Sequence, residues 1–425
     1  MERRFEERLA ELEAEAVVSP EVFAEVLPRV EKFIEPFVTK FKSEASRKLA
    51  SQYVHGLLSG VERKNVESIA YHHDQHRMPL QKFIGQREWN HRHLLHELAE
   101  QVGQKLGESD AVIVFDPTSF PKKGTKSVGV ARQWSGRLGK VDNCQVATFM
   151  AYVSRGGHAL VNMRLYLSKE WAKDKTRRRM CGVPKEVKFQ TRHEHALEML
   201  AENGSQLPHA WIAGDDEMGK SAAFRGELRA RGEHYVLAVP SNFTIRDLHA
   251  TPPEPTSPRG ALRKTPFMQV RKWAAAQAKS AWKTFNVRDG EKSPIVVEAI
   301  STRVISKFER RVCEDEETLL VLREKLSDGT WKYDYHLCHE PPNTKNAELV
   351  RVAKAEHRVE ECFQQAKSEV GLAHYEVRTW EGWHHHITLA LLASLFLTLE
   401  TQGEKKIRTG DHRSASSPHH RRRAA

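Results

Sequence analysis

The sequence is poor in cysteine and has no apolar segment long enough to span a bilayer. Its five cysteines are scattered along 425 residues without a CxxC pair. This argues against a disulfide framework and against a zinc ribbon. The longest apolar run, residues 387–399, is too short to cross a membrane, and the first residues are charged and amphipathic rather than leader-like. We therefore expect a cytoplasmic protein that has no membrane segment.

Positive charge is what the sequence has in excess. Lysine and arginine number 67 against 56 acidic residues, giving a net charge of +11 and a pI near 9.3. An excess of this size favours a polyanionic partner, nucleic acid first and an anionic membrane surface second. No lysine-rich amphipathic helix with exposed aromatics supports the membrane alternative. On charge alone, a merely basic soluble protein stays open.

The pattern of residues divides the chain into five parts. Residues 1–108 have the apolar spacing of helices, and residues 109–240 alternate strands with helices. Residues 241–345 are strand-rich and predict a β-rich insertion, residues 346–402 return to helices, and residues 403–425 form a basic, serine-rich tail that we expect to be disordered. The expected fold class is α/β (α+β): a mixed sheet flanked by helices, with the insertion and an N-terminal helical domain.

The N-terminal helical part mixes basic and aromatic residues, among them Arg92 and Trp89. Bases interleaved with aromatics on helices are suited to phosphate contact and groove docking. A solvated helical face gives the same pattern. We carry the part forward as a helical DNA-binding domain, with that alternative open.

Two predicted strands end on an aspartate. The apolar stretch 112–115 leads into Asp116, and the stretch 211–214 leads into Asp215. A carboxylate at the end of a buried strand is costly unless it is paired, hydrogen-bonded or bound to a metal, although Asp116 can also simply cap a turn. Two such anions at one sheet edge repel each other, so a divalent cation is their natural partner. Oxygen ligands without a Cys/His cluster suit Mg²⁺ or Mn²⁺.

A third carboxylate is predicted on the long helix after residue 345. The apolar stripe of this helix consists of Val359, Phe363, Ala366 and Val370. Glu360 lies about a quarter turn from the stripe, whereas Glu361 lies more than half a turn away and is predicted to point to water. Lys367, seven residues after Glu360, lies on the same side of the helix and adds a base for phosphate. A solvated Glu–Lys face is the alternative.

The order of these features resembles the DDE transposases of bacterial insertion sequences. The phrases "FDPTSFPKKG", "AGDDEMGKSAAFR" and "HRVEECFQQAKSEVGLAHYEVRTWEGWHHHITLALLA" are similar to the branch of that group with a β-rich insertion and a Tyr-Arg-Glu-Lys signature. The resemblance covers about residues 50–400. It implies a ribonuclease H-like core and metal-dependent cleavage and strand transfer, of the cut-and-paste type, at terminal inverted repeats.

The resemblance assigns roles to particular residues. Asp116, Asp215 and Glu360 match the catalytic, metal-binding triad, which would hold two Mg²⁺ (or Mn²⁺) ions, and Lys367 matches the lysine of the signature. No covalent enzyme intermediate is implied, because the carboxylates act as metal ligands.

Half of the signature is absent from this chain. Its arginine position holds Glu356, and its tyrosine position holds Ala353. Arg351, Lys354 or Arg358 would have to supply the missing charge.

The remaining predicted DNA contacts are basic or aromatic side chains near these motifs. The complete set is Lys122, Lys123, Lys126, Arg358, Lys367, Arg378 and Trp380. The lysines directly after Asp116 would meet phosphate beside the metal ions. For Arg378 a structural ion pair is the alternative, and for Trp380 it is packing in the core. The segment 173–180 predicts an exposed basic loop, and the consecutive histidines at 384–386 point in different directions on a helix, which disfavours one metal site.

The expected partner is double-stranded DNA, as transposon ends and as target, near the bacterial nucleoid and away from membranes. Bringing two ends together implies a homodimer in the synaptic complex. Two alternatives stay open: a metal-dependent nuclease of the same fold that cuts without joining, and a catalytically inactive DNA-binding regulator derived from a transposase.

Overall fold

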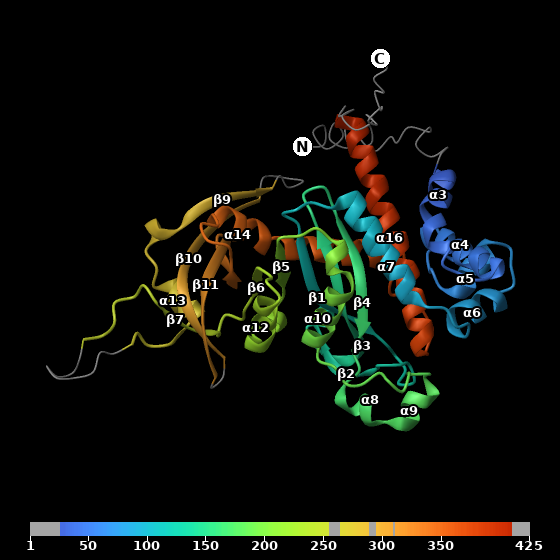
Figure 1. Cartoon of the computed structure of the whole chain (residues 1–425), viewed down its shortest axis with the longest axis horizontal. Helices are drawn as coiled ribbons and strands as arrows, with labels where there is room; N and C mark the ends of the chain where they lie inside the picture. Colours follow the sequence, from blue (N-terminus) through green and yellow to red (C-terminus); the bar gives the residue numbers. More distant parts are fainter. Residues whose placement is uncertain (1–25, 255–263, 289–294, 309–310, 410–425) are drawn as a thin grey trace, which may run out of the picture.

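The computed structural model of the chain describes residues 26–254, 264–288, 295–308 and 311–409. Figure 1 shows N-terminal helices at one end, a helix-flanked sheet in the middle and a β-rich region at the other end. The amphipathic segment before residue 26 and the end of the basic tail lie outside the described residues. Helix α16 (Trp380–Thr409) continues to Thr409. Residues 403–409, which we assigned to a disordered tail, are therefore helical.

Within the described residues, one mixed sheet contains twelve strands. Its central strands are β1 (Val112–Pro121), β2 (Ala131–Ser135), β3 (Lys140–Val153), β4 (His158–Leu165), β5 (Trp211–Gly214) and β6 (Tyr235–Ala238). The main order is β4-β3-β1-β5-β6. β3 is antiparallel to β1 and β4, whereas β1, β5 and β6 are parallel. Antiparallel neighbours followed by parallel crossovers are the predicted ribonuclease H-like arrangement, so the fold class is confirmed.

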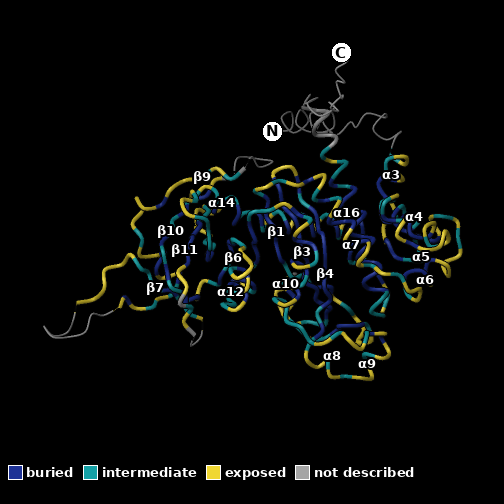
Figure 2. The backbone as a smooth tube through the Cα atoms, viewed as in Figure 1, coloured by how far each residue is buried: buried dark blue, intermediate teal, exposed yellow. Residues whose placement is uncertain are grey.

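Helices cover both faces of this central sheet. They include α10 (Arg192–Asn203), α11 (Asp216–Gly219), α12 (Ala222–Ala230), α14 (Asn346–Ala353) and α15 (Ala355–Ser368). The short helices α8 (Lys169–Lys173) and α9 (Lys175–Met180) lie beyond the end of the sheet (Figure 1). The first four residues of β1 are fully buried, as in a sheet covered on both faces. Figure 2 shows the buried residues concentrated in the central strands and in α16.

Side-chain alternation identifies the helix on each face. The ring of Phe363 in α15 lies 5.1 Å from that of Phe149 in β3, so α15 covers the Phe149 face. Asn203 of α10 accepts a hydrogen bond at 2.5 Å from Asn162 of β4. Asn162 pairs with Met150. Because Met150 directly follows Phe149 in β3, the side chains of Met150 and Asn162 point to the face opposite Phe149. α10 therefore covers the opposite face.

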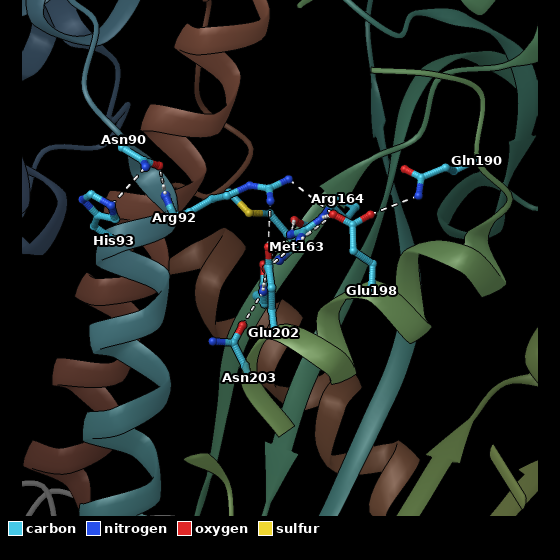
Figure 3. Close-up of polar contacts among 10 residues, drawn as sticks. Asn90, Arg92, His93, Met163, Arg164, Gln190, Glu198, Glu202 and Asn203 are labelled. Carbon is cyan, nitrogen blue, oxygen red and sulfur yellow. Dashed lines mark hydrogen bonds and ion pairs between the residues drawn. The ribbon is translucent and has the colours of Figure 1, made fainter. Parts of the chain in front are cut away.

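An ion-pair cluster around the buried Arg164 joins α7 (His91–Leu106), β4 and α10 (Figure 3). Arg164 of β4 donates to Glu202 at 2.6 Å and to Glu198 at 3.3 Å. Arg92 of α7 donates to Glu202 at 2.8 Å. Trp89 stacks on the His385 ring at 3.7 Å. Arg92 and Trp89, which we considered for DNA contact, therefore connect the helical region to the core.

The N-terminal region consists of short amphipathic helices. They are α3 (Val26–Val38), α4 (Glu44–Leu58), α5 (Val66–His72), α6 (Met78–Gly85) and α7 (His91–Leu106). Their buried residues belong to the same hydrophobic cluster as those of the sheet. Among the described helices, α16 included, none is long and apolar enough to cross a membrane.

The β-rich region extends the same sheet. Its elements are β7 (Thr244–Asp247), β8 (Met268–Gln269), α13 (Val270–Ala275), the 3-10 turn η3 (Lys279–Ala281), β9 (Lys283–Arg288), β10 (Ile295–Phe308), β11 (Arg311–Lys325) and β12 (Trp331–His339). Two other 3-10 turns, η1 (Gly136–Leu138) and η2 (Gly204–Gln206), lie in the core. β12 pairs with β6, which makes the sheet continuous. A second hydrophobic cluster, from Val239 to Leu337, lies in this region. The division of the chain at residues 240 and 345 is our proposal.

Three expected local features are corrected by the structure. The predicted long helix after residue 345 is two helices, α14 and α15, which meet at Lys354. The predicted basic loop at 173–180 is mostly the short helix α9, begun by the side chain of Asp174, which accepts from the Arg177 amide. β1 does not end at Asp116 but continues for five more residues, paired with β3.

Candidate active site

Backbone register brings Asp116 and Asp215 together. The parallel pairing of β1 with β5 ends at Phe115 and Gly214, so the next residue of each strand is an aspartate at the same sheet edge. Asp215 is also the N-cap of α11, where its Oδ1 accepts from the Met218 amide at 3.1 Å. The predicted convergence of these two carboxylates is therefore present.

Helix α15 faces Asp116 directly. Asp116 pairs with Phe149, so both side chains lie on the face that α15 covers. Two residues further along β1, Thr118 lies on the same face and its Oγ1 accepts from Lys367 Nζ at 2.8 Å. Lys367, predicted from its spacing in the sequence, is thus held beside the β1 aspartate.

Two glutamates of α15 approach the aspartates, one turn apart. The side chain of Glu360 is 70% exposed, and its Oε2 lies 3.1 Å from His357 Nδ1. Glu356 is half-buried in the cleft beside Asp215. The more enclosed glutamate is therefore the one at the arginine position of the signature, which the sequence interpretation did not assign to the site. The four-residue spacing of Glu356 and Glu360, which puts both on one helix side, is the signal that could have found it.

The carboxylates influence one another strongly. Burial raises the pKa of Asp116 well above its usual value, and the charge of Asp215 adds to this. Glu356 and then Glu360 act in the same direction on Asp116, while Lys367 opposes them. Burial, followed by the charge of Asp215, raises the pKa of Glu356 to about 8. Burial raises the pKa of Asp215 to about 6, against the hydrogen bond from Met218.

A cleft of about 600 Å³ opens between the core and the β-rich region at this point. Asp215, Glu356 and Glu360 line its core side, and Asp334 and neighbouring residues of β12 line the other. Lys354 lies between them and donates to Asp334 at 3.2 Å. Asp215, Glu356 and Glu360 therefore face the cleft, whereas Asp116 is not among the residues that line it.

The donor set fits a hard divalent cation. All of the converging groups are carboxylates, the ligands that Mg²⁺ and Mn²⁺ prefer. As the side chains lie, no group of three or more His, Cys, Asp or Glu residues in the described ranges is close enough to hold one ion. Mutual repulsion between ionised carboxylates acts to keep such side chains apart, and a bound ion would draw them together.

The three lysines after Asp116 lie away from the aspartates. Lys122 follows Asp116 by six residues, five of them in β1, so it lies roughly 20 Å further along the strand. Lys122 Nζ lies 3.5 Å from the centre of the Tyr375 ring, and burial lowers its pKa to about 8. Lys123 and Lys126 are exposed. Our expectation that these lysines stand beside the metal ions was wrong, because β1 does not turn at Asp116.

Other residues that we predicted lie around the site or elsewhere. The side chain of Glu361 is partly exposed, and its Oε2 is 3.8 Å from His158 Nε2. Arg358 is half-buried on α15. Arg378 is exposed and lines a separate cavity of about 520 Å³. Trp380 begins α16, with its ring 4.3 Å from that of His384, away from the aspartates.

The three consecutive histidines are buried and contact different groups. His384 Nδ1 lies 2.9 Å from the carbonyl of Trp380. His385 lies 2.9 Å from the carbonyl of Ile84. His386 lies 2.8 Å from the Tyr53 hydroxyl. His385 and His386 thus tether α16 to α6 and α4, whereas the hydrogen bond of His384 stays within α16.

A ribonuclease H-like sheet that places two aspartates side by side, opposite a helix with acidic and basic residues, is the arrangement expected of nucleases that act on phosphodiesters through metal ions. The model of one family, described as DDE superfamily endonuclease, matches residues 36–294. Since this is more than half of the chain, the protein belongs to that family, whose members use divalent metal ions. Its mixed sheet, helices and enzyme class agree with the resemblance noted from the sequence.

Two further comparisons complete the picture. The chain is similar to a piggyBac transposase, solved by cryo-EM as a synaptic complex with hairpin DNA. The TM-score is 0.40 and the identity is 10%, with 94% of this chain and 75% of that chain covered. A search of curated proteins finds no match.

Proposed function

We propose that the protein is a transposase that cuts DNA at the ends of a mobile element and joins them to a target. One observation carries the proposal: Asp116 and Asp215 are register neighbours at the edge of β1 and β5, facing the helix that bears Lys367. Membership of the DDE superfamily endonucleases supports the same chemistry.

In this proposal Asp116, Asp215 and Glu360 hold the metal, with Glu356 adjacent to them. Two Mg²⁺ or Mn²⁺ ions would supply an activated water and neutralise charge at the scissile phosphate. The carboxylates act as ligands and form no covalent bond to DNA. Lys367, fixed by Thr118, would contact the phosphate next to the cut. The cleft would orient the strand and exclude part of the surrounding water.

The substrate in this proposal is duplex DNA with terminal inverted repeats, cut and pasted into target DNA. Residues 1–108 would bind the repeat, together with Arg358, Arg378, Trp380 and the exposed lysines after β1. Two ends have to be brought together, so the working form would be a homodimer.

A DNA-binding regulator is the second candidate, and Glu356 is the observation in its favour. This glutamate adds a fourth carboxylate where the signature has an arginine, next to the place that an anionic DNA strand would take. Repulsion of the phosphate there would weaken cleavage while leaving DNA binding elsewhere intact.

A strand-transfer assay separates these functions. Purified full-length protein, Mg²⁺ and a labelled duplex carrying the terminal repeat of the flanking element are incubated with a target plasmid, alongside Asp116→Asn and Asp215→Asn. A transposase nicks at the repeat boundary and joins the 3′ end, and both variants bind DNA but do not cut. Cutting without joining would indicate a nuclease, and binding without cutting would indicate the regulator. Failure to bind the duplex would contradict all three functions.

A further inference from the structure

Most of the formal positive excess lies in two segments, residues 122–142 and 169–188. Together they contain 14 lysines and arginines and four acidic residues, a net charge of +10, and the whole chain has a net charge of +11. We call these segments the basic lobe. Figure 1 shows β2, α8 and α9 at the same end of the molecule, beyond the last residues of β1.

Hydrogen bonds hold the two segments of the basic lobe together. The indole of Trp171 donates to the Val130 carbonyl at 2.7 Å. Arg177 donates to the same carbonyl at 3.1 Å and to that of Thr125 at 3.3 Å. These hydrogen bonds engage backbone carbonyls and a single cation, Arg177, so most lysines and arginines of the basic lobe stay exposed. Since the bonds hold the two segments together, their exposed charges form one surface.

The hairpin of β2 and β3 presents apolar side chains in the middle of this charge. Trp134 is 60% exposed and pairs directly with Val141, which is 50% exposed. Leu138, in the turn between the strands, is 40% exposed. Arg132 lies two residues before Trp134, on the same face of β2. An exposed Trp–Val pair surrounded by cations is the pattern of a surface that covers bases and phosphates together.

Strand alternation places this hairpin surface on the same side of the sheet as the aspartates. Asp116 pairs with Phe149, and Val141 precedes Phe149 by eight residues in β3. The spacing is even. β3 pairs with β1 as far as Cys144 and with β2 from Cys144 to Lys140, without a register shift in either ladder, so both side chains lie on one face. Trp134 shares that face because it pairs with Val141. The Trp134–Val141 pair thus lies roughly 27 Å along the sheet from Asp116, about eight base steps along a DNA strand.

We propose that the basic lobe docks on the duplex DNA that flanks the cleavage site, with Trp134 and Val141 packed against a base step about eight steps away. The lysines and arginines would neutralise phosphates on both sides, and the apolar pair would partly unstack the step, as apolar wedges in DNA-binding proteins do. A second copy of the chain fits this surface poorly, because two basic lobes repel each other. The inference rests on the proposed function only in that the same duplex would enter the cleft.

The test measures DNA affinity without metal, so that cleavage plays no part. Fluorescence anisotropy with a 30-bp duplex compares full-length wild type with Trp134→Ala, and with Trp331→Ala as the matched control, since Trp331 is a 37% exposed tryptophan in the β-rich region. We expect Trp134→Ala to bind about tenfold more weakly, as loss of one stacking contact does, and Trp331→Ala to match wild type. Arg132→Gln should reduce the salt slope of log K by about one.

A second readout identifies the contact with bases. 2-Aminopurine in the duplex should brighten on binding wild type, because its base step is unstacked, and should not brighten with Trp134→Ala. Equal affinity and equal brightening for wild type and Trp134→Ala would overturn this inference and leave the proposed function standing. Absence of duplex binding by wild type would overturn both. A dimer that Trp134→Ala converts to a monomer in sedimentation would assign the surface to self-association and overturn the inference.

Discussion

Asp116 and Asp215 lie side by side because β1 and β5 run parallel and their pairing stops one residue earlier. Their raised pKa values mean that protons compete with metal for these oxygens near neutral pH. A bound divalent ion would displace those protons. At the residue scale, metal affinity should therefore increase with pH. The size of this increase depends on which glutamate of α15 is the third carboxylate ligand.

Replacement of each α15 glutamate by glutamine distinguishes their roles. We expect Glu356→Gln to weaken Mn²⁺ binding at least as much as Glu360→Gln does, about tenfold or more, because Glu356 is the more enclosed and lies nearer Asp116 in electrostatic terms. Electron paramagnetic resonance of free Mn²⁺ measures this without DNA.

Glu361→Gln is the matched control, since Glu361 lies on the same helix but is directed to His158. Its Mn²⁺ affinity should equal that of wild type. If Glu360→Gln alone abolishes Mn²⁺ binding while Glu356→Gln leaves it unchanged, Glu356 is only a neighbour of the site.

Lys367 should tune the ionisation of Asp116. Its positive charge lowers the pKa of that carboxyl, so Lys367→Met raises this pKa further and moves the pH midpoint of Mn²⁺ binding upward. Lys367→Arg should restore the wild-type midpoint while cleavage stays impaired, because the larger guanidinium shifts the positive charge away from the place where Lys367 Nζ donates to Thr118. The same midpoint in Lys367→Met and wild type would contradict the coupling.

At the scale of elements, the β-rich region is attached to the core by a strand ladder and by a buried ion pair. The fully buried Arg225 of α12 donates from Nε to Glu317 Oε1 of β11 at 2.7 Å, and from Nη2 to Ser306 of β10 at 2.8 Å. The Tyr235 hydroxyl of β6 donates to the same carboxylate at 2.7 Å. These bonds keep the two walls of the cleft in a fixed relation.

Breaking this pair on one side should destabilise the protein severely. Arg225→Met leaves Glu317 buried without its main partner, for an expected loss of about 3–5 kcal/mol in the free energy of unfolding. The double variant Arg225→Met/Glu317→Leu should recover part of this, because no uncompensated charge remains. Urea denaturation measures both. A double variant less stable than the single one would show that the pair itself is strongly stabilising.

The elements also show what the sequence can and cannot predict. The sequence pattern of apolar and polar residues predicts β1 and β5, and it predicts the aspartate after the buried stretch of each strand. The sequence does not predict that β1 continues past Asp116, because the pairing of β1 with β3 is a long-range contact that overrides the turn propensity of Pro117. Glu356 was missed because rotation of α15 about its axis depends on packing of Phe363 against Phe149. A helix period alone leaves that angle uncertain by a fraction of a turn.

At the scale of the whole molecule, α16 is the shared centre of the helical region and the core. Figure 2 shows it buried between them. Burial lowers the pKa of His384 and of His386 in this helix to about 3 each, so these two imidazoles are neutral. In α10, burial lowers the pKa of His195 to about 4. Acidification must therefore act against the folded state at these positions.

His195 offers a clean measure of that effect. As the pH falls, a histidine with a lowered native pKa is protonated in the unfolded chain before it is protonated in the folded chain. The stability that neutral His195 contributes to the folded state is therefore present above about pH 6.5 and is lost as the pH falls to about 4. Relative to His195→Leu, wild type should lose about 3 kcal/mol of stability between pH 7.5 and 4. Urea denaturation at the two pH values measures this difference. The exposed His93→Leu is the control, and parallel loss in wild type and His195→Leu would contradict the assignment.

The central claim is that Asp116, Asp215 and α15 together hold divalent metal. Its most direct test replaces Mg²⁺ with Fe²⁺, adds ascorbate and peroxide, and maps the backbone cuts by mass spectrometry. Cuts should cluster near residues 116, 215 and 356–360, disappear when excess Mg²⁺ is added, and be absent from the Asp116→Asn/Asp215→Asn double variant. Cuts at other positions, or an unchanged pattern in the double variant, would contradict the account.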